Sequence, residues 1–229
     1  MAATTIISYD DTLNDHDALM LGRLFASAGS ELTLAYVRHT TQVEHAREEL
    51  EEHDAERLLE RGARWLDDLD VERRIIVSAS TGEGLRWLAE QEEADIVVFG
   101  SDYRTAAGHV APQKSAWTLL EGGTAAVAIA PANYRSNRDA QVHRIGVLAT
   151  PGDDATIETA RHLADRFDAV VSRDEHQVDL LVVGSRAEAP EGRVMLSSQA
   201  QNEIEDAGCP VLVLPRGARI DFASPIYVA

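Results

Sequence analysis

The sequence Asp179-Leu180-Leu181-Val182-Val183-Gly184-Ser185 is an apolar run that ends in a glycine-serine pair. It predicts a buried strand followed by a tight turn. A polar loop leads to Ser197-Ser198, where a helical pattern begins, and a second apolar run over 210–214 ends at Pro215. Strand, loop, helix and strand therefore follow one another within a short segment.

The first half of the chain contains the same order of elements. Its parts are an apolar run over 94–99, the pair Gly100-Ser101, a helix that begins at Gln113-Lys114 and an apolar run over 124–130 that ends at Pro131. In both copies 31 positions separate the glycine from the closing proline. An internal repeat at a fixed spacing indicates two structural units of one type.

A glycine-serine turn before a helix is a candidate phosphate site. Glycine lets the backbone approach a ligand closely, and the first turn of the helix offers unpaired N–H groups. In open parallel sheets, ligands bind in the crevice beyond the carboxyl ends of the strands. The alternative is that Gly100 and Gly184 only end their strands. The repeat supports the fold and leaves ligand binding open.

Strands alternate with helices along the whole chain, which predicts an α/β fold with parallel sheets and right-handed crossovers. We expect first-half strands over 4–8, 31–37 and 74–78, and helices from Asn14 or Asp15, over 41–68 and over 81–91. The long acidic helix over 41–68 has apolar positions at steps of three and four residues. A polar segment over 132–141 reads as a linker.

The second half restarts with strands over 142–149 and 168–172 that flank a helix. Only 173–177 separate that second strand from the next, whereas the first half has a helix, a strand and a helix in this interval. We therefore predict domains over 1–131 and 142–215, the latter reduced by one αβα segment, and a tail over 216–229. Pro225 and the apolar 226–228 could pack on another part of the protein, which the sequence alone does not specify.

On these residues the chain resembles the universal stress protein family in a tandem, two-domain form. The family motif for phosphate and ribose is Gly, two residues, Gly, nine residues, Gly, then Ser or Thr. The matching positions are Gly100, Tyr103, Gln113 and Lys114 in the first half, and Gly184, Ala187, Ser197 and Ser198 in the second. Neither copy is intact, because the first keeps only its leading glycine and the second its leading glycine and terminal serine.

The resemblance implies two Rossmann-like domains, each an open parallel sheet with helices on both faces, that form an internal pseudo-dimer. Subunits of the family meet at the edge formed by their last strands, so we expect the strands over 124–130 and 210–214 to pair or pack. An exposed apolar edge is a liability unless it is covered. A homodimer of the whole chain is a further option.

The resemblance also implies an adenine nucleotide such as ATP as ligand. Asp10 matches the adenine-contacting aspartate of the family, with a turn or helix-cap role as the alternative. The second half has Leu148 there, so no adenine nucleotide is expected in it. Val37 and Val77 are predicted core residues that also line the pocket. The first-half site also includes Ser101 and Gln113, whose side chain should crowd the backbone approach, so the phosphates are expected farther out, held by Lys114 and Arg104. The alternative for Lys114 is a solvated surface lysine. In the second half, backbone donors of Gly184, Ser197 and Ser198 could hold a lone phosphate.

Composition excludes several classes of partner. The formal net charge of −18 makes nucleic acid and anionic membranes unfavourable partners. No apolar run approaches the ~20 residues of a membrane span, and the N-terminus lacks a signal-peptide pattern. Cys209 is the single cysteine, which fits a reducing cytoplasm. The eight histidines are scattered, so no zinc site is predicted.

Three interpretations of function remain at this stage. One is a stress-response regulatory protein that binds an adenine nucleotide non-classically in its first half. Another is a stress-related interaction scaffold with both sites degenerate. A third is a slow nucleotide hydrolase acting on a phosphate near Lys114. No catalytic nucleophile and base can be named, so no enzyme activity is predicted with assigned residues.

Overall fold

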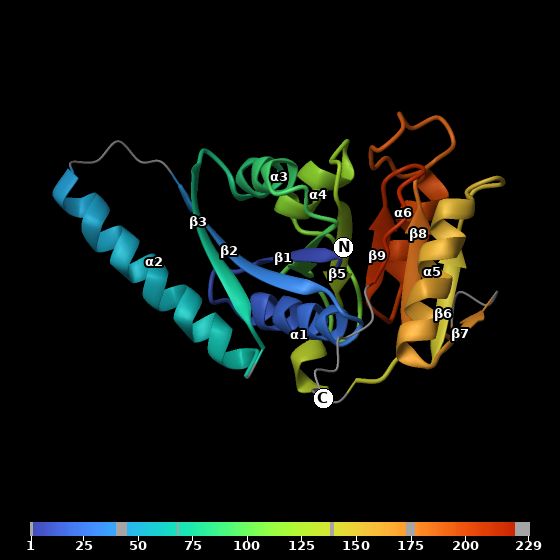
Figure 1. Ribbon diagram of the computed structural model, residues 1–229, viewed down its shortest axis with the longest axis horizontal. Coiled ribbons are helices and arrows are strands. Elements are labelled where there is room, and N and C mark those ends of the chain that lie inside the picture. The colour runs from blue at the N-terminus through green and yellow to red at the C-terminus, as the bar shows by residue number, and fades with distance from the viewer. Residues whose placement is uncertain (1, 40–44, 68, 138–139, 173–176, 223–229) are drawn as a thin grey trace.

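The computed structural model describes residues 2–39, 45–67, 69–137, 140–172 and 177–222 (Figure 1). The elements of the first half are β1 (Thr4–Ser8), α1 (Leu13–Ser27), β2 (Glu31–His39), α2 (His45–Trp65), β3 (Val71–Ser78), α3 (Thr81–Gln91), β4 (Ile96–Gly100), α4 (Lys114–Leu120) and β5 (Ala126–Ala130). Those of the second half are η1 (Tyr134–Ser136), β6 (Arg144–Leu148), α5 (Asp154–Phe167), β7 (Val170–Ser172), β8 (Leu180–Gly184), α6 (Ser198–Asp206) and β9 (Val211–Leu214).

All described strands belong to one nine-stranded sheet in the order β3-β2-β1-β4-β5-β9-β8-β6-β7. Every neighbouring pair is parallel except β5 and β9, which are antiparallel. The predicted α/β fold class, with a mostly parallel sheet and helices on both faces, is confirmed. In Figure 1 the blue-to-green first half and the yellow-to-red second half meet at these two strands.

The last strands of the two halves pair directly, as expected. Val127 lies opposite Val213, Ala128 opposite Leu212, and Ile129 opposite Val211. Both strands are fully buried, because each covers the edge that the other would expose. The two halves therefore share one continuous sheet, while their description as a pseudo-dimer of two domains stays an interpretation.

The second half is shorter than the first in the way the sequence predicts. β7 is followed by β8 with no helix among the described residues between them, whereas α2, β3 and α3 separate β2 from β4. The order β9-β8-β6-β7 repeats β5-β4-β1-β2, and no second-half strand corresponds to β3. An αβα segment is thus missing at the outer end of the sheet.

Two apolar layers cover the sheet. One contains side chains of α1 and α5, such as Phe25 and Leu163, and the other those of α3, α4 and α6, such as Leu85, Leu119 and Ile204. Each layer runs across both halves, since strand residues alternate between the two faces. The core is therefore continuous through the junction of β5 and β9.

The start of α1 differs from the prediction. Thr12 is the N-cap, in place of Asn14 or Asp15. The hydroxyl of Thr12 accepts a hydrogen bond from the N–H of Asp15, and the Asp15 carboxylate accepts one from the N–H of Thr12. This reciprocal pair is a capping box, which fixes the first turn better than a lone cap.

The linker and the tail both pack on the body of the protein. Asn133 and Arg135 of the linker bind Asp17 of α1 through their backbone N–H groups. In the tail, the N–H of Ile220 donates to Thr159, and Phe222 stacks on Phe25 with 6.2 Å between ring centroids. The expected packing of Pro225 and 226–228 lies outside the described residues, as does the predicted helix start over 41–44.

Candidate functional site

The glycine-serine turn after β4 is occupied by the protein itself. A Cβ atom on Gly100 would overlap the backbone carbonyl of Asn14 at the start of α1. The hydroxyl of Ser101 is buried, donates to the carbonyl of Ala130 at 2.7 Å and accepts from the N–H of Ala111 at 3.2 Å. The glycine therefore permits helix packing, and the serine holds the end of β5 and the loop. Neither group faces an open crevice, so the predicted ligand contact of Ser101 is replaced by a structural role.

The second half repeats this arrangement. A Cβ atom on Gly184 would overlap the carboxylate of Asp153 and would lie 2.8 Å from the hydroxyl of Thr156. Ser197 is the N-cap of α6, and its hydroxyl accepts from the N–H of Ala200 at 3.1 Å. Ser198, the first residue of that helix, is exposed. A carboxylate against Gly184 is an unfavourable neighbour for the lone phosphate expected there.

The remaining predicted phosphate contacts lie at the surface. Gln113 is the N-cap of α4 without a side-chain cap hydrogen bond, and Lys114 is exposed. The guanidinium of Arg104 donates to the hydroxyl of Tyr103 at 2.7 Å and lies over its ring. None of these three residues lines the cavity beside Asp10.

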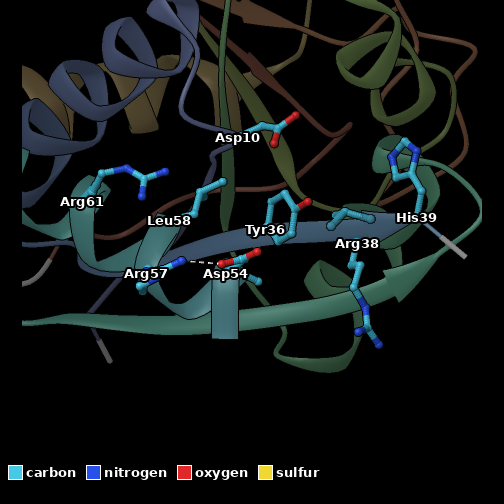
Figure 2. Close-up of a pocket in the computed structure, with 10 residues that line it drawn as sticks. Asp10, Tyr36, Arg38, His39, Asp54, Arg57, Leu58 and Arg61 are labelled. Atoms are coloured by element: carbon cyan, nitrogen blue, oxygen red, sulfur yellow. Dashed lines mark hydrogen bonds and ion pairs between the residues drawn. The ribbon is translucent and has the colours of Figure 1, made fainter. Parts of the chain in front are cut away.

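A cavity of about 510 Å³ lies beside Asp10, between β2 and the second half of α2 (Figure 2). Asp10 follows β1, the strand next to β2, so the cavity is at the carboxyl ends of these strands. Its lining residues are Asp10, Tyr36, Val37, Arg38, His39, Asp54, Ala55, Arg57, Leu58 and Arg61. The volume lies within the range of small-molecule pockets, about 300–1,000 Å³.

The structure thus separates the predicted site residues. Asp10 and Val37 line the same cavity, and Val37 is buried as expected. Val77 does not line it and is 50% exposed, which corrects its prediction as a core residue. Successive side chains of a strand point to opposite faces of the sheet, and on β3 it is the neighbouring Ile76 that points to the buried face.

The loop that carries Asp10 is held by one buried carboxylate. The same oxygen of Asp15 accepts from the N–H of Asp10 at 3.0 Å, from the N–H of Thr12 at 3.0 Å and from the hydroxyl of Thr12 at 2.7 Å. Burial raises the pKa of Asp15, against these hydrogen bonds. Desolvation and then the nearby Asp15 carboxylate raise the pKa of Asp10. The position of Asp10 is therefore set by α1.

A second network joins this loop to α2. Arg61 of α2 binds one carboxylate oxygen of Asp11 through two nitrogens, each at 2.8 Å, and Tyr9 donates to the other oxygen at 2.7 Å. His16 stacks on Trp65 of α2. Burial works against the charge of Asp11, but the hydrogen bonds from Tyr9 and Arg61 outweigh it and lower its pKa. Arg61 therefore belongs both to the cavity wall and to the anchor of α2.

Sequence analysis missed the basic wall of the cavity. Arg38 comes from β2, and Arg57 and Arg61 come from α2. None of these three arginines was named as a candidate from the sequence, and Arg57 and Arg61 lie within the acidic helix predicted over 41–68. The signal that was available is their spacing, because positions four apart lie on one helix face.

Comparison with known proteins bears on the fold. Residues 170–215 match the model of the Universal stress protein family. No curated protein matches the chain. The crystal structure of a universal stress protein from Archaeoglobus fulgidus DSM 4304 has a TM-score of 0.68 at 14% identity, over 93% of this chain and 98% of that one.

The chain has the universal stress protein fold. A putative universal stress protein from Pseudomonas aeruginosa UCBPP-PA14 gives a TM-score of 0.63 at 12% identity, over 94% of both chains. A functionally unknown protein from Pseudomonas aeruginosa PAO1 gives 0.64 at 13% identity, over 94% of this chain and 93% of that one. The predicted resemblance to the family is confirmed. The family model supports it over residues 170–215, and the similarity of fold supports it over nearly the whole chain.

Metal sites and membrane-spanning helices are two further features to consider. Among the described residues no group of three or more His, Cys, Asp or Glu side chains is arranged to hold a metal ion. Within the same ranges, no helix has both the length and the apolar character that crossing a membrane requires.

Proposed function

We propose that the protein is a stress-response regulatory protein that binds one adenine nucleotide in its first half, in the cavity beside Asp10. The observation that carries this proposal is the position of the cavity. It opens next to Asp10, at the carboxyl ends of β1 and β2, where ligands bind in open parallel sheets. Val37, Leu58 and Tyr36 give it apolar and aromatic surface for a base.

The proposal assigns the binding to the first half alone. The registers of β1 on β4 and of β6 on β8 match Ile7 with Val147, so Leu148 corresponds to Ser8 and the position of Asp10 is taken by Thr150, which corrects the expected match. Thr150 is no carboxylate, and the described residues of the second half contain no counterpart of α2 and β3. Because α2 forms one wall of the first-half cavity, its absence removes the equivalent wall. We therefore propose one nucleotide per chain.

The alternative is an interaction scaffold that binds no nucleotide. A specific observation favours it: both glycine-serine turns are filled by the protein's own groups. The two proposals differ in what the purified protein carries. Nucleotide released from the full chain by heat denaturation and identified by mass spectrometry supports binding. Protein that releases none, even after incubation with ATP and rapid desalting, supports the scaffold.

A further inference from the structure

We infer that the phosphate end of the ligand lies against α2, between Arg57 and Arg61, and not at the glycine-serine turns. This inference rests on the proposed nucleotide binding beside Asp10 and adds the direction in which the nucleotide lies. In this inference the phosphate contacts are made by Arg57 and Arg61 of α2, and not by Lys114 and Arg104 as the sequence suggested.

The glycine-serine turns are partly filled by groups of the protein itself. A phosphate is held there by backbone groups, which requires an open approach to the glycine. On the side of Gly100 where a Cβ atom would lie, the carbonyl of Asn14 packs against the glycine, and a carbonyl oxygen repels an anion. The neighbouring hydroxyl of Ser101 is already bound to the protein backbone on both its donor and its acceptor side.

On the side of Asp10 that faces α2, the cavity provides open space and arginine side chains. Asp54, Arg57, Leu58 and Arg61 follow the i, i+3, i+4, i+7 spacing that places them on one face of α2, and all four line the cavity. In Figure 2 Arg61 and Leu58 project from α2 on the side of Asp10, and Arg57 lies beside Asp54. Asp54, Arg57 and Arg61 are exposed, whereas the face of α2 that packs on the protein is apolar, with Ala55 and Leu59 buried. The charged side chains therefore lie at the open side of the cavity.

The spacing of the two arginines is unfavourable for a helix on its own. Like charges four residues apart destabilise a helix. A carboxylate offsets each of the two charges. Arg57 forms an ion pair with Asp54 at 2.6 Å, and Arg61 forms one with Asp11 at 2.8 Å. The Arg57–Asp54 pair is well exposed on both sides, at 60% and 67%, so it stabilises the protein little and Arg57 can turn to a phosphate.

The charge of the wall also selects for an anion. The residues that line the cavity include three arginines, Arg38, Arg57 and Arg61, and two carboxylates, Asp10 and Asp54, in a chain whose net charge is −18. The carboxylate of Asp11, which is not a lining residue, binds Arg61. In Figure 2 the Arg38 side chain extends away from Asp10, which places it at the rim. Arginine matches phosphate oxygens with paired N–H donors. A local positive wall concentrates anionic ligands despite the acidic surface.

The test is calorimetric titration of the full chain with adenosine, AMP and inorganic phosphate. Arg57→Gln is the main variant, because the guanidinium of Arg57 binds Asp54, an exposed residue of its own helix. Arg64→Gln is the matched control, since Arg64 is an exposed arginine on the same helix that does not line the cavity. Lys114→Gln tests the glycine-serine side. Thermal unfolding of each variant checks that the fold is kept.

We expect Arg57→Gln to weaken AMP binding by about tenfold and to leave adenosine within about twofold of the wild type. Arg61→Gln should weaken AMP at least as much, and Arg64→Gln and Lys114→Gln should change neither ligand. AMP binding that falls in Lys114→Gln and not in Arg57→Gln overturns the inference while the proposed function stands. Inorganic phosphate that binds as tightly as AMP overturns it too, because the nucleoside would then contribute nothing. If the wild type binds neither adenosine nor AMP, the proposed function fails and this inference fails with it.

Discussion

The hydroxyl groups of Ser101 and Ser185 make the same hydrogen bonds in the two halves of the protein. Each serine is 1% exposed and donates at 2.7 Å to the carbonyl of the last residue of the next strand, Ala130 or Leu214. Each also accepts from a loop N–H, that of Ala111 at 3.2 Å or Met195 at 3.1 Å. The two halves therefore share individual hydrogen bonds as well as the order of their elements.

Ser101→Ala and Ser185→Ala should each lower the free energy of unfolding by about 1–3 kcal/mol. The reason is that each substitution leaves a buried carbonyl and a loop N–H without their common partner. Urea unfolding followed by circular dichroism measures the change. Nucleotide affinity should not change in either variant. If Ser101→Ala keeps full stability but loses nucleotide binding, Ser101 contacts the ligand and its structural role is wrong.

Asp17 should fasten the linker to α1. Its carboxylate is fully buried and binds the side chain of Arg135 at 3.0 Å together with two linker N–H groups. Arg135→Met leaves a buried charge without its counter-ion, so we expect a loss of about 3–5 kcal/mol in unfolding free energy. Hydrogen exchange at the amides of Asn133 and Arg135 should become faster. Unchanged exchange at these two amides would show that the ion pair does not hold the linker.

The stability of the protein should depend on pH through Asp15. Its folded-state pKa is raised above the ordinary value of 3.8, chiefly by burial. The stabilisation that follows from a raised pKa is fully present below about pH 3.8 and is lost as the pH rises through the folded-state pKa. Asp15→Asn removes this dependence. The loss of unfolding free energy caused by Asp15→Asn should therefore be smaller at about pH 7 than at about pH 4.

Urea unfolding of both proteins at the two pH values measures this difference. A loss that grows with pH would mean that the pKa of Asp15 is lowered in the folded protein, so that its hydrogen bonds outweigh its burial. Asp206→Asn is a suitable control, because Asp206 is exposed at the end of α6 and should behave alike at both pH values.

Much of the fold could be predicted from the sequence because its signals are local and repeated. Apolar runs that end in Gly100-Ser101 and Gly184-Ser185 locate the two central strands, and the short interval after 168–172 reveals the missing αβα segment. The bounds of α3 were predicted at Thr81 and Gln91, as observed. The partner of β5 followed from the resemblance, since its own residues do not specify β9.

The candidate site was predictable only in part, because its walls depend on tertiary packing. Asp10 could be found from its place after the strand over 4–8 and Val37 from its place in the strand over 31–37, and both line the cavity. The filling of the space at Gly100 by Asn14 involves segments far apart in the sequence, so no local pattern reports it. The exposure of Val77 likewise depends on what packs over its face of β3, because the neighbouring Ile76 on the opposite face is buried.

The second half should bind no adenine nucleotide. Thr150, which stands at the position of Asp10, offers no carboxylate, and among the described residues the wall that α2 provides in the first half has no counterpart. Photolabelling of the full chain with 8-azido-ATP, followed by peptide mapping, tests this directly. We expect labelled peptides only from residues 2–137. Labelled peptides that contain Leu148 or its neighbours would overturn the assignment.

Calorimetric titration of the wild type and of Asp10→Ala with ATP tests nucleotide binding beside Asp10 most directly, with Asp206→Ala as the control. We expect a stoichiometry of one ATP per chain for the wild type and for the control. We also expect an affinity at least about tenfold lower for Asp10→Ala, because that variant loses the polar contact to the nucleoside. No heat of binding at millimolar ATP, or the same affinity with and without the Asp10 carboxylate, would contradict nucleotide binding beside Asp10.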